Sequence, residues 1–284
     1  DPEPALAVGE FDCVDSDGRT YIYQSTWTDS GDTLTINRGI NNDSGTFSSS
    51  VIETFNSWDH NNIDEVNALS IQTDGSMYAI LKKDNSNNDL YLYKLNYNSS
   101  GVGTSTYISS VNLGTGENNA ASNYEVESGG TTYKYIFTSK GFFNGNQKVI
   151  RINSNGTYKV ITPTITNTGN GSNKAKDFAW VSNHPSGLDF VGYDSNANDL
   201  LGAEITSHTN IGASNEAITI DLSVINGNIG SGIGSNSGAA MSLGNGDVYF
   251  LENSTGDLWL YDQSAGSLTE TNDDFSSSSN TDGA

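Results

Sequence analysis

The sequence has little cysteine, few basic residues and no long apolar run. Cys13 is its only cysteine, which excludes an intrachain disulfide and a metal cluster of the Cys-x-x-Cys type. Lys and Arg number 12 against 34 Asp and Glu, for a formal net charge of -22. Nucleic-acid binding needs a basic surface that displaces phosphate counterions, so this class is excluded. No apolar run approaches the roughly 18 residues of a membrane-spanning helix, and we expect no membrane insertion.

Glycine, aromatic residues and polar turn residues are plentiful. The 284 residues include 31 Gly, 14 Tyr and 10 Phe, and aromatic residues make up 10% of the chain. Such a composition is typical of all-β proteins, whose strands favour aromatic and β-branched side chains. The acid excess and the scarcity of lysine fit an extracellular or cell-surface protein.

A repeat of about 56 residues runs through the chain. Five pairs of a glycine and an aromatic residue three positions later recur at spacings of 57, 55, 57 and 59 residues between the glycines. Five such pairs in step indicate a repeat architecture. The glycines are Gly18, Gly75, Gly130, Gly187 and Gly246, and the aromatic residues are Tyr21, Tyr78, Tyr133, Phe190 and Tyr249.

Each repeat contains four short apolar or alternating segments separated by turn residues, which predicts four antiparallel strands. A four-stranded unit of this length, repeated around a ring, is the blade of a β-propeller. We therefore predict one five-bladed β-propeller over residues 1–274. The expected blades are residues 10–57, 66–113, 122–165, 176–223 and 238–272.

Two segments of the chain resemble a known kind of repeat. The segment FDCVDSDGRTYIYQS, followed by TLTIN, and the segment DVYFLENSTGDLWLYD are similar to repeats of poorly characterised propeller domains in bacterial secreted and cell-surface proteins. The resemblance implies a surface propeller and brings no catalytic residue with it.

Different structures are expected for the two ends of the chain. The segment around Asp12 and Cys13 is predicted to be the innermost strand of the first blade, where Cys13 would be a small buried side chain. The apolar residues 5–8 could pair with the last blade and close the ring. Residues 275–284 (FSSSSNTDGA) are expected to be a Ser-rich tail or the start of a linker.

The loops between second and third strands, and between blades, are the most variable and are the expected binding face. Aromatic residues beside Asn and Asp suit carbohydrate, because the ring packs on the sugar face while amides and carboxylates bind hydroxyls. The alternative for each residue is that it caps the core. The candidate ligand-binding residues are Trp27, Trp58, Asp59, His60, Phe142, Phe143 and Tyr193.

Calcium is a second expectation for these loops. Several turns place oxygen-bearing side chains at every second residue, which suits a hard cation, although no EF-hand glutamate follows and such residues are also common in turns. The candidate calcium ligands are Asp15, Asp17, Asp84, Asp89, Asp194 and Asp199.

The favoured function is a binding or adhesion module for a glycan or a surface protein. One alternative is a self-associating subunit of a surface filament or layer. Another is a glycoside-active enzyme with paired carboxylates around the channel. The acids expected on inner strands fall at unmatched registers, so no catalytic residue is predicted. These acids are Asp12, Glu125, Glu127 and Asp177.

Overall fold

The protein is described from a computed structural model. The residues that it describes are 10–14, 17–29, 32–41, 47–61, 63–83, 89–98, 100–112, 120–139, 147–167, 177–194, 198–226, 233, 237–243, 245–275 and 281–283. They form 21 β-strands and no helix, and none of them contributes a helix able to cross a membrane.

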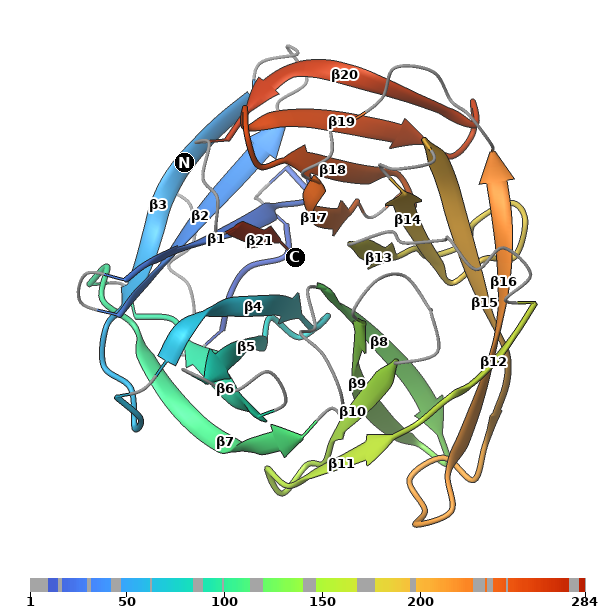
Figure 1. The fold of residues 1–284 in the computed structure, drawn as a ribbon, viewed down its shortest axis with the longest axis horizontal. Helices are drawn as coiled ribbons and strands as arrows, with labels where there is room; N and C mark the ends of the chain where they lie inside the picture. The colour runs from blue at the N-terminus through green and yellow to red at the C-terminus, as the bar shows by residue number, and fades with distance from the viewer. Residues whose placement is uncertain are drawn as a thin grey trace.

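The strands form five sheets arranged as a ring around a central axis, which confirms the predicted five-bladed β-propeller (Figure 1). From the axis outwards, blade 1 contains β21 (Thr281–Gly283), β1 (Ile22–Thr28), β2 (Thr33–Asn41) and β3 (Phe47–Phe55). Blade 2 contains β4 (Ile63–Ile71), β5 (Met77–Lys83), β6 (Asp89–Asn96) and β7 (Thr104–Asn112).

Blade 3 contains β8 (Ala120–Ser128), β9 (Thr131–Ser139), β10 (Lys148–Ile152) and β11 (Tyr158–Ile161). Blade 4 contains β13 (Phe178–Trp180), β14 (Phe190–Asp194), β15 (Asp199–Thr209), β16 (Ala217–Asn226) and β12 (Thr164–Thr166). Blade 5 contains β17 (Ser237–Ser242), β18 (Val248–Glu252), β19 (Asp257–Asp262) and β20 (Ser267–Asp274).

Blade 4 departs from the predicted four strands. β12, expected within blade 3, instead pairs in parallel with β16, from Thr164 opposite Thr219 to Thr166 opposite Asp221. Both the Thr166 hydroxyl and the Asn167 amide donate hydrogen bonds to Asp221 Oδ1, at 2.7 and 2.6 Å. The connection between blades 3 and 4 thus covers the outer edge of blade 4.

The C-terminal strand closes the ring. β21 pairs antiparallel with β1, with Thr281 opposite Thr26 and Gly283 opposite Gln24, so it supplies the innermost strand of blade 1. The expectation that this segment is a tail or linker is therefore wrong for residues 281–283. Residues 5–8, predicted to close the ring, lie outside the described residues.

The segment around Asp12 and Cys13 is not an inner strand, which corrects its predicted place. It crosses the first turn of blade 2 instead, where the Phe11 amide donates a hydrogen bond to Gly75 O at 2.9 Å. The Tyr21 amide donates to Cys13 O at 2.9 Å, and the chain then enters β1. β21 already occupies the position next to β1, so this segment is not a strand of the inner ring.

All five repeated glycines have positive φ, between 75° and 92°, as the turn preceding the second strand of each blade was expected to require. Four of the five aromatic residues that follow them are buried: Tyr21, Tyr78, Phe190 and Tyr249, whereas Tyr133 is half-buried.

The hydrophobic core is divided among the gaps between neighbouring blades. Five clusters of buried side chains join blades 1 and 2, 2 and 3, 3 and 4, 4 and 5, and 5 and 1. In the last cluster Ile22 of blade 1 packs with Met241 and Tyr249 of blade 5. Each blade therefore depends on both of its neighbours, which is why the ring must close.

Gly75→Ala should destabilise the protein more than Gly130→Ala. Both glycines have positive φ, +79° and +77°, which costs an alanine about 1–2 kcal/mol. A Cβ at Gly75 would also collide with the backbone of Phe11, whereas none of the described atoms lies within 4 Å of a Cβ at Gly130. We expect Gly75→Ala to lose about 1–3 kcal/mol more in denaturant unfolding. Equal losses would show that the N-terminal segment is not held at this turn.

Candidate functional site

A cavity of about 210 Å³ lies where the inner strands converge on the axis. Its walls come from β4, β8, β13 and β17 and from the segment that leads into β1. Thr73 and Leu243, in the turns between first and second strands, also line it, so the cavity reaches the face opposite the predicted binding loops. Much of that loop face lies outside the described residues. We call this hollow the axial cavity.

Short side chains line the axial cavity on three blades, with Ser70 from β4, Ala121 and Ser122 from β8, and Ala240 and Ser242 from β17. In the sequence each of these serines stands two residues after an alanine, at Ala68, Ala120 and Ala240, in an Ala-x-Ser triplet. Neighbouring inner strands lie close together at the axis, and short side chains leave a hollow between them. The sequence interpretation overlooked these residues because it concentrated on loops, although the triplet was visible in three repeats.

The wall combines three kinds of side chain. Trp180, Tyr21 and Tyr23 supply aromatic surface, and Leu69, Ala121, Ala179 and Ala240 supply aliphatic surface. The polar side chains carry hydroxyl or amide groups: Thr20, Ser70, Gln72, Thr73, Ser122, Asn123, Ser182 and Ser242.

Two hydrogen bonds fix this wall across blade boundaries. Ser122 Oγ on β8 accepts a hydrogen bond from the Trp180 amide on β13 at 2.7 Å. The Gln72 side chain, 1% exposed, donates from Nε2 to Tyr135 O on β9 at 3.4 Å. Blades 2, 3 and 4 are thus joined next to the cavity.

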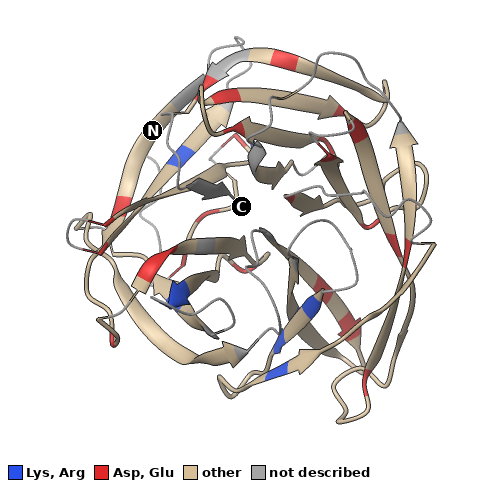
Figure 2. Ribbon diagram, in the orientation of Figure 1, with Lys and Arg blue, Asp and Glu red and all other residues tan. Residues whose placement is uncertain are grey.

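None of the described Asp, Glu, Lys, Arg or His side chains lines the axial cavity. Figure 2 shows acidic residues around the ring instead, on outer strands such as β20 and on β4. The acids of β4, Asp64 and Glu65, lie at its start and both contact Lys82 Nζ at 3.1 Å. The lining from β4 begins only at Leu69, so the described lining of the cavity is uncharged although the chain is strongly acidic.

The acids considered for glycoside hydrolysis do not meet in the cavity. Glu125 is held at the rim, where its carboxylate accepts hydrogen bonds from the Thr73 amide and hydroxyl at 2.8 and 2.7 Å. Glu127 is exposed, and Asp177 is buried just before β13 without lining the cavity. Asp12 is not on a strand of the inner ring. A carboxylate pair across the channel is therefore not formed by these residues.

Cys13 is a half-buried thiol on the cavity wall, and not the fully buried side chain expected. Its Sγ donates to Gln72 O at 3.7 Å. Burial, together with nearby acids such as Asp12 and Asp74, raises the pKa of the Cys13 thiol. The thiol is accordingly protonated at neutral pH, a state that disfavours nucleophilic chemistry.

Three of the predicted ligand-binding residues lie together between blades 1 and 2. Trp27 is 5% exposed and its ring lies 6.1 Å from that of Trp58, whose Nε1 donates to Asp32 O at 2.7 Å. The His60 ring stacks on Tyr91 at 4.0 Å. The cluster mainly caps the core, and Trp27 is too buried to contact a ligand.

The other four candidate ligand-binding residues are Tyr193, Asp59, Phe142 and Phe143. Tyr193 is 0% exposed, and its hydroxyl donates to Asn198 Oδ1 at 2.9 Å, so its predicted role in binding is wrong. It points into the core because it lies in the middle of blade 4, on β14. Asp59 is exposed beside His60. Phe142 and Phe143 lie outside the described residues.

The predicted calcium ligands do not form a site among the described residues. Asp17 forms an ion pair with Arg19, with 3.1 Å between Oδ2 and Nη2. Asp194 is fully buried within β14, and Asp199 is half-buried. Within the described part of the chain, no three His, Cys, Asp or Glu side chains converge as a metal would require. Asp15, Asp84 and the side chain of Asp89 lie outside it, so calcium binding stays a prediction.

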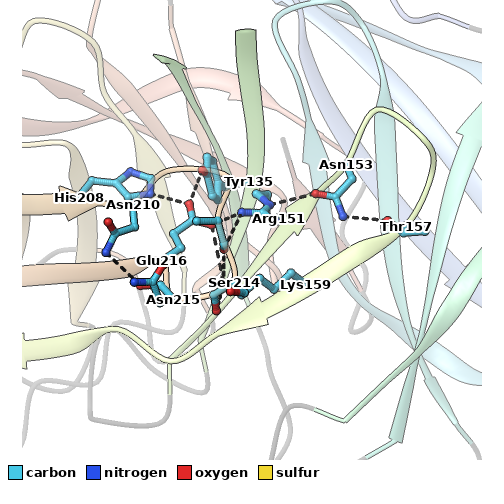
Figure 3. A network of polar contacts seen from close by, with 11 residues as sticks. Tyr135, Arg151, Asn153, Thr157, Lys159, His208, Asn210, Ser214, Asn215 and Glu216 are labelled. Atoms are coloured by element: carbon cyan, nitrogen blue, oxygen red, sulfur yellow. Dashed lines mark hydrogen bonds and ion pairs between the residues drawn. The ribbon is translucent and has the colours of Figure 1, made fainter. Parts of the chain in front are cut away.

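A second polar cluster, centred on Glu216, joins blades 3 and 4 (Figure 3). The Glu216 side chain is 0% exposed and forms an ion pair with Arg151. Its Oε1 accepts from the Tyr135 hydroxyl at 2.5 Å and lies 2.8 Å from His208 Nε2. All its partners are protein groups, which indicates a structural role.

Burial would raise the pKa of Glu216, but hydrogen bonds from Tyr135 and His208 and the charge of Arg151 outweigh it and hold this pKa below its usual value. The same site raises the pKa of Tyr135, through burial first and then through the Glu216 carboxylate. Glu216 is therefore ionised and Tyr135 neutral at pH 7.

Comparison with known proteins assigns the chain to no family. No protein-family model matches the chain, and no curated protein sequence matches it significantly. Similar solved structures include a 6-phosphogluconolactonase candidate from Bacteroides uniformis, 16% identical with a TM-score of 0.43, and virginiamycin B lyase from Staphylococcus aureus, 13% identical with a TM-score of 0.38. Alignment covers 89% and 93% of this chain, and 66% and 73% of those chains.

A third similar structure is an auxiliary nutrient binding protein from Bacteroides thetaiotaomicron, 14% identical with a TM-score of 0.37. Alignment covers 93% of this chain and 63% of that one. The chain thus spans about two thirds of the length of these Bacteroides proteins. At such identities the activities of the three do not transfer.

Glu216→Gln should destabilise the protein at neutral pH by about 3–5 kcal/mol, because it leaves Arg151 buried without its counter-charge. Because the folded state lowers the pKa of Glu216, its carboxylate stabilises the fold above the usual glutamate pKa of 4.5, and this contribution is lost as pH falls through the lowered pKa. The variant should therefore lose less stability than the unmodified protein on acidification below pH 4.5. Urea unfolding at several pH values measures both effects. Glu204→Gln, at an exposed residue, is the control.

Proposed function

We propose that the chain is a binding module that holds one unit of a neutral carbohydrate in the axial cavity. The observation that carries the proposal is the lining, in which aromatic surface, hydroxyls and amides surround a hollow without a charged side chain among the described residues. Its volume of about 210 Å³ suits one small ligand, and not a polymer.

The chemistry of the wall matches that of a sugar ring. A pyranose has apolar C–H faces that pack on aromatic rings, and Trp180 is a half-buried aromatic residue on the wall. Its hydroxyls both donate and accept hydrogen bonds, as the serine hydroxyls of the inner strands do. A charged ligand would need an opposite charge, which the described lining does not provide.

Such a lining favours binding of a sugar without hydrolysis of it. Hydrolysis of a glycoside requires an acid and a base or nucleophile on the two sides of the bond. The described lining of the cavity offers hydroxyls, amides and a protonated thiol instead of carboxylates. An extracellular or cell-surface location remains part of this proposal, supported by the acidic composition.

The test is calorimetric titration with the methyl glycosides of glucose, galactose, mannose and N-acetylglucosamine. We expect one of them to bind, and Trp180→Leu to weaken binding at least tenfold because the aromatic surface is lost. Trp58→Phe, the control on the opposite face, should bind as the unmodified protein does.

Two results would contradict the proposal. If none of the glycosides binds, the axial cavity is not a neutral sugar site. If Trp58→Phe loses binding while Trp180→Leu retains it, the site is on the loop face, as the sequence interpretation predicted.

A further inference from the structure

We infer that Asn123 determines which sugars the axial cavity binds, by pairing its side-chain amide with two hydroxyls on adjacent carbons of the ring. The inference rests on the proposed function and adds one residue and one requirement to it. The ligand must carry a neighbouring pair of hydroxyls, of which one donates a hydrogen bond to the amide and the other accepts one.

The Asn123 side chain lies on the face of β8 that is turned toward blade 2. β8 pairs with β9 without a bulge, so side chains alternate along it and Ala121, Asn123 and Glu125 share one face. Ala121 packs in the core cluster between blades 2 and 3. The Glu125 carboxylate accepts hydrogen bonds from the amide and hydroxyl of Thr73 in blade 2. Asn123 lies between these two contacts and therefore points toward β4.

The space that Asn123 faces is the axial cavity. On the opposite side of this space, Ser70 and Ile71 of β4 line the cavity, and Asn123 lines it from β8. Asn123 is half-buried, whereas Ser70 is only 2% exposed. The Asn123 side chain is thus open to the cavity and is not sealed in the core between the blades.

The amide of Asn123 is free to bind a ligand. The described lining contains two side-chain amides, those of Gln72 and Asn123. The Gln72 amide is buried and donates to Ser70 Oγ and Tyr135 O, both at 3.4 Å. The Asn123 side chain forms no hydrogen bond with any of the described residues. A few such polar groups, placed on a largely apolar wall, are what orients a small ligand in a pocket.

An amide matches a pair of hydroxyls better than a single one. It carries an acceptor oxygen and a donor nitrogen side by side, and a sugar hydroxyl can donate or accept. Hydroxyls on adjacent carbons of a pyranose also lie side by side unless both are axial. One can donate to Asn123 Oδ1 while its neighbour accepts from Nδ2. The requirement is the same whichever way the amide is turned.

The consequence is selectivity among closely related sugars. A sugar that lacks either hydroxyl leaves one polar atom of the Asn123 amide without a partner in the complex, and should bind more weakly. A serine hydroxyl has a single oxygen and sets no such spacing. Asn123 is thus a specificity-determining residue, whereas Trp180 supplies affinity for any ring.

The test is Asn123→Leu, which keeps the size of the side chain and removes both polar atoms. Asn123→Ala is the second variant, in case leucine distorts the wall. The matched control is Glu127→Leu, on the same face of β8 at an exposed residue that does not line the cavity. The probe is the methyl glycoside that the unmodified protein binds, together with its monodeoxy analogues.

We expect both Asn123 variants to bind the parent glycoside about 10- to 100-fold more weakly, the value of two hydrogen bonds. Two monodeoxy analogues, changed at adjacent carbons, should each lose about three- to tenfold with the unmodified protein and nothing further with the variants. The unliganded variants should melt no lower than the unmodified protein, because Asn123 has no hydrogen bond to the described residues. Glu127→Leu should leave affinity and selectivity unchanged.

The outcomes separate the two proposals. Failure of the unmodified protein to bind any glycoside overturns the proposed function and this inference with it. Variants that still discriminate against the same two deoxy analogues overturn the inference alone, as does sensitivity of the unmodified protein to hydroxyls that are not adjacent. A lower melting temperature of both unliganded variants, with unchanged affinity, would assign Asn123 a purely structural role.

Discussion

The pairing of β21 with β1 is the contact on which the rest of the ring depends. Three residues at the end of the chain occupy the innermost position of blade 1 and lie against the inner strands β17 and β4. A β-propeller is held together by its blade-to-blade cores, and an open ring would leave two of its sheets with an uncovered face. Closure therefore protects the cores on both sides of blade 1. It also completes the circle of inner strands that surrounds the axial cavity.

The acidic residues and the proposed binding site are separated in space in this protein. The acidic residues that give the chain its net charge of -22 occur around the ring, whereas the described lining of the axis is neutral. The buried ion pair of Arg151 and Glu216 stabilises the boundary between blades 3 and 4 and does not reach the cavity wall. Tyr135 lies between them, because its hydroxyl donates to Glu216 and its carbonyl accepts a hydrogen bond from Gln72 on the cavity wall. The proposed neutral recognition site thus lies within an acidic scaffold.

The sequence predicted the number of blades and the turn glycines, because each repeat must reproduce the same backbone turn. It did not predict the C-terminal strand, the place of the segment around Asp12 and Cys13, or the axial cavity. β21 has the sequence Thr-Asp-Gly, which carries no hydrophobic pattern, and only its pairing with β1 identifies it as a strand. Tyr193 lies among Asp and Asn in the sequence but projects into the core. Gln72 is a polar residue at a strand end, and only the convergence of blades 2 and 3 shows that it is buried.

The most direct test of ring closure is hydrogen exchange at the amides of Gln24, Ser25 and Thr26, measured by mass spectrometry in the full chain and in a chain lacking residues 276–284. Closure by β21 predicts slow exchange at the inner edge of β1 in the full chain, and both faster exchange there and a lower melting temperature after the deletion. Unchanged exchange and unchanged melting would contradict closure of the ring by the C-terminal strand.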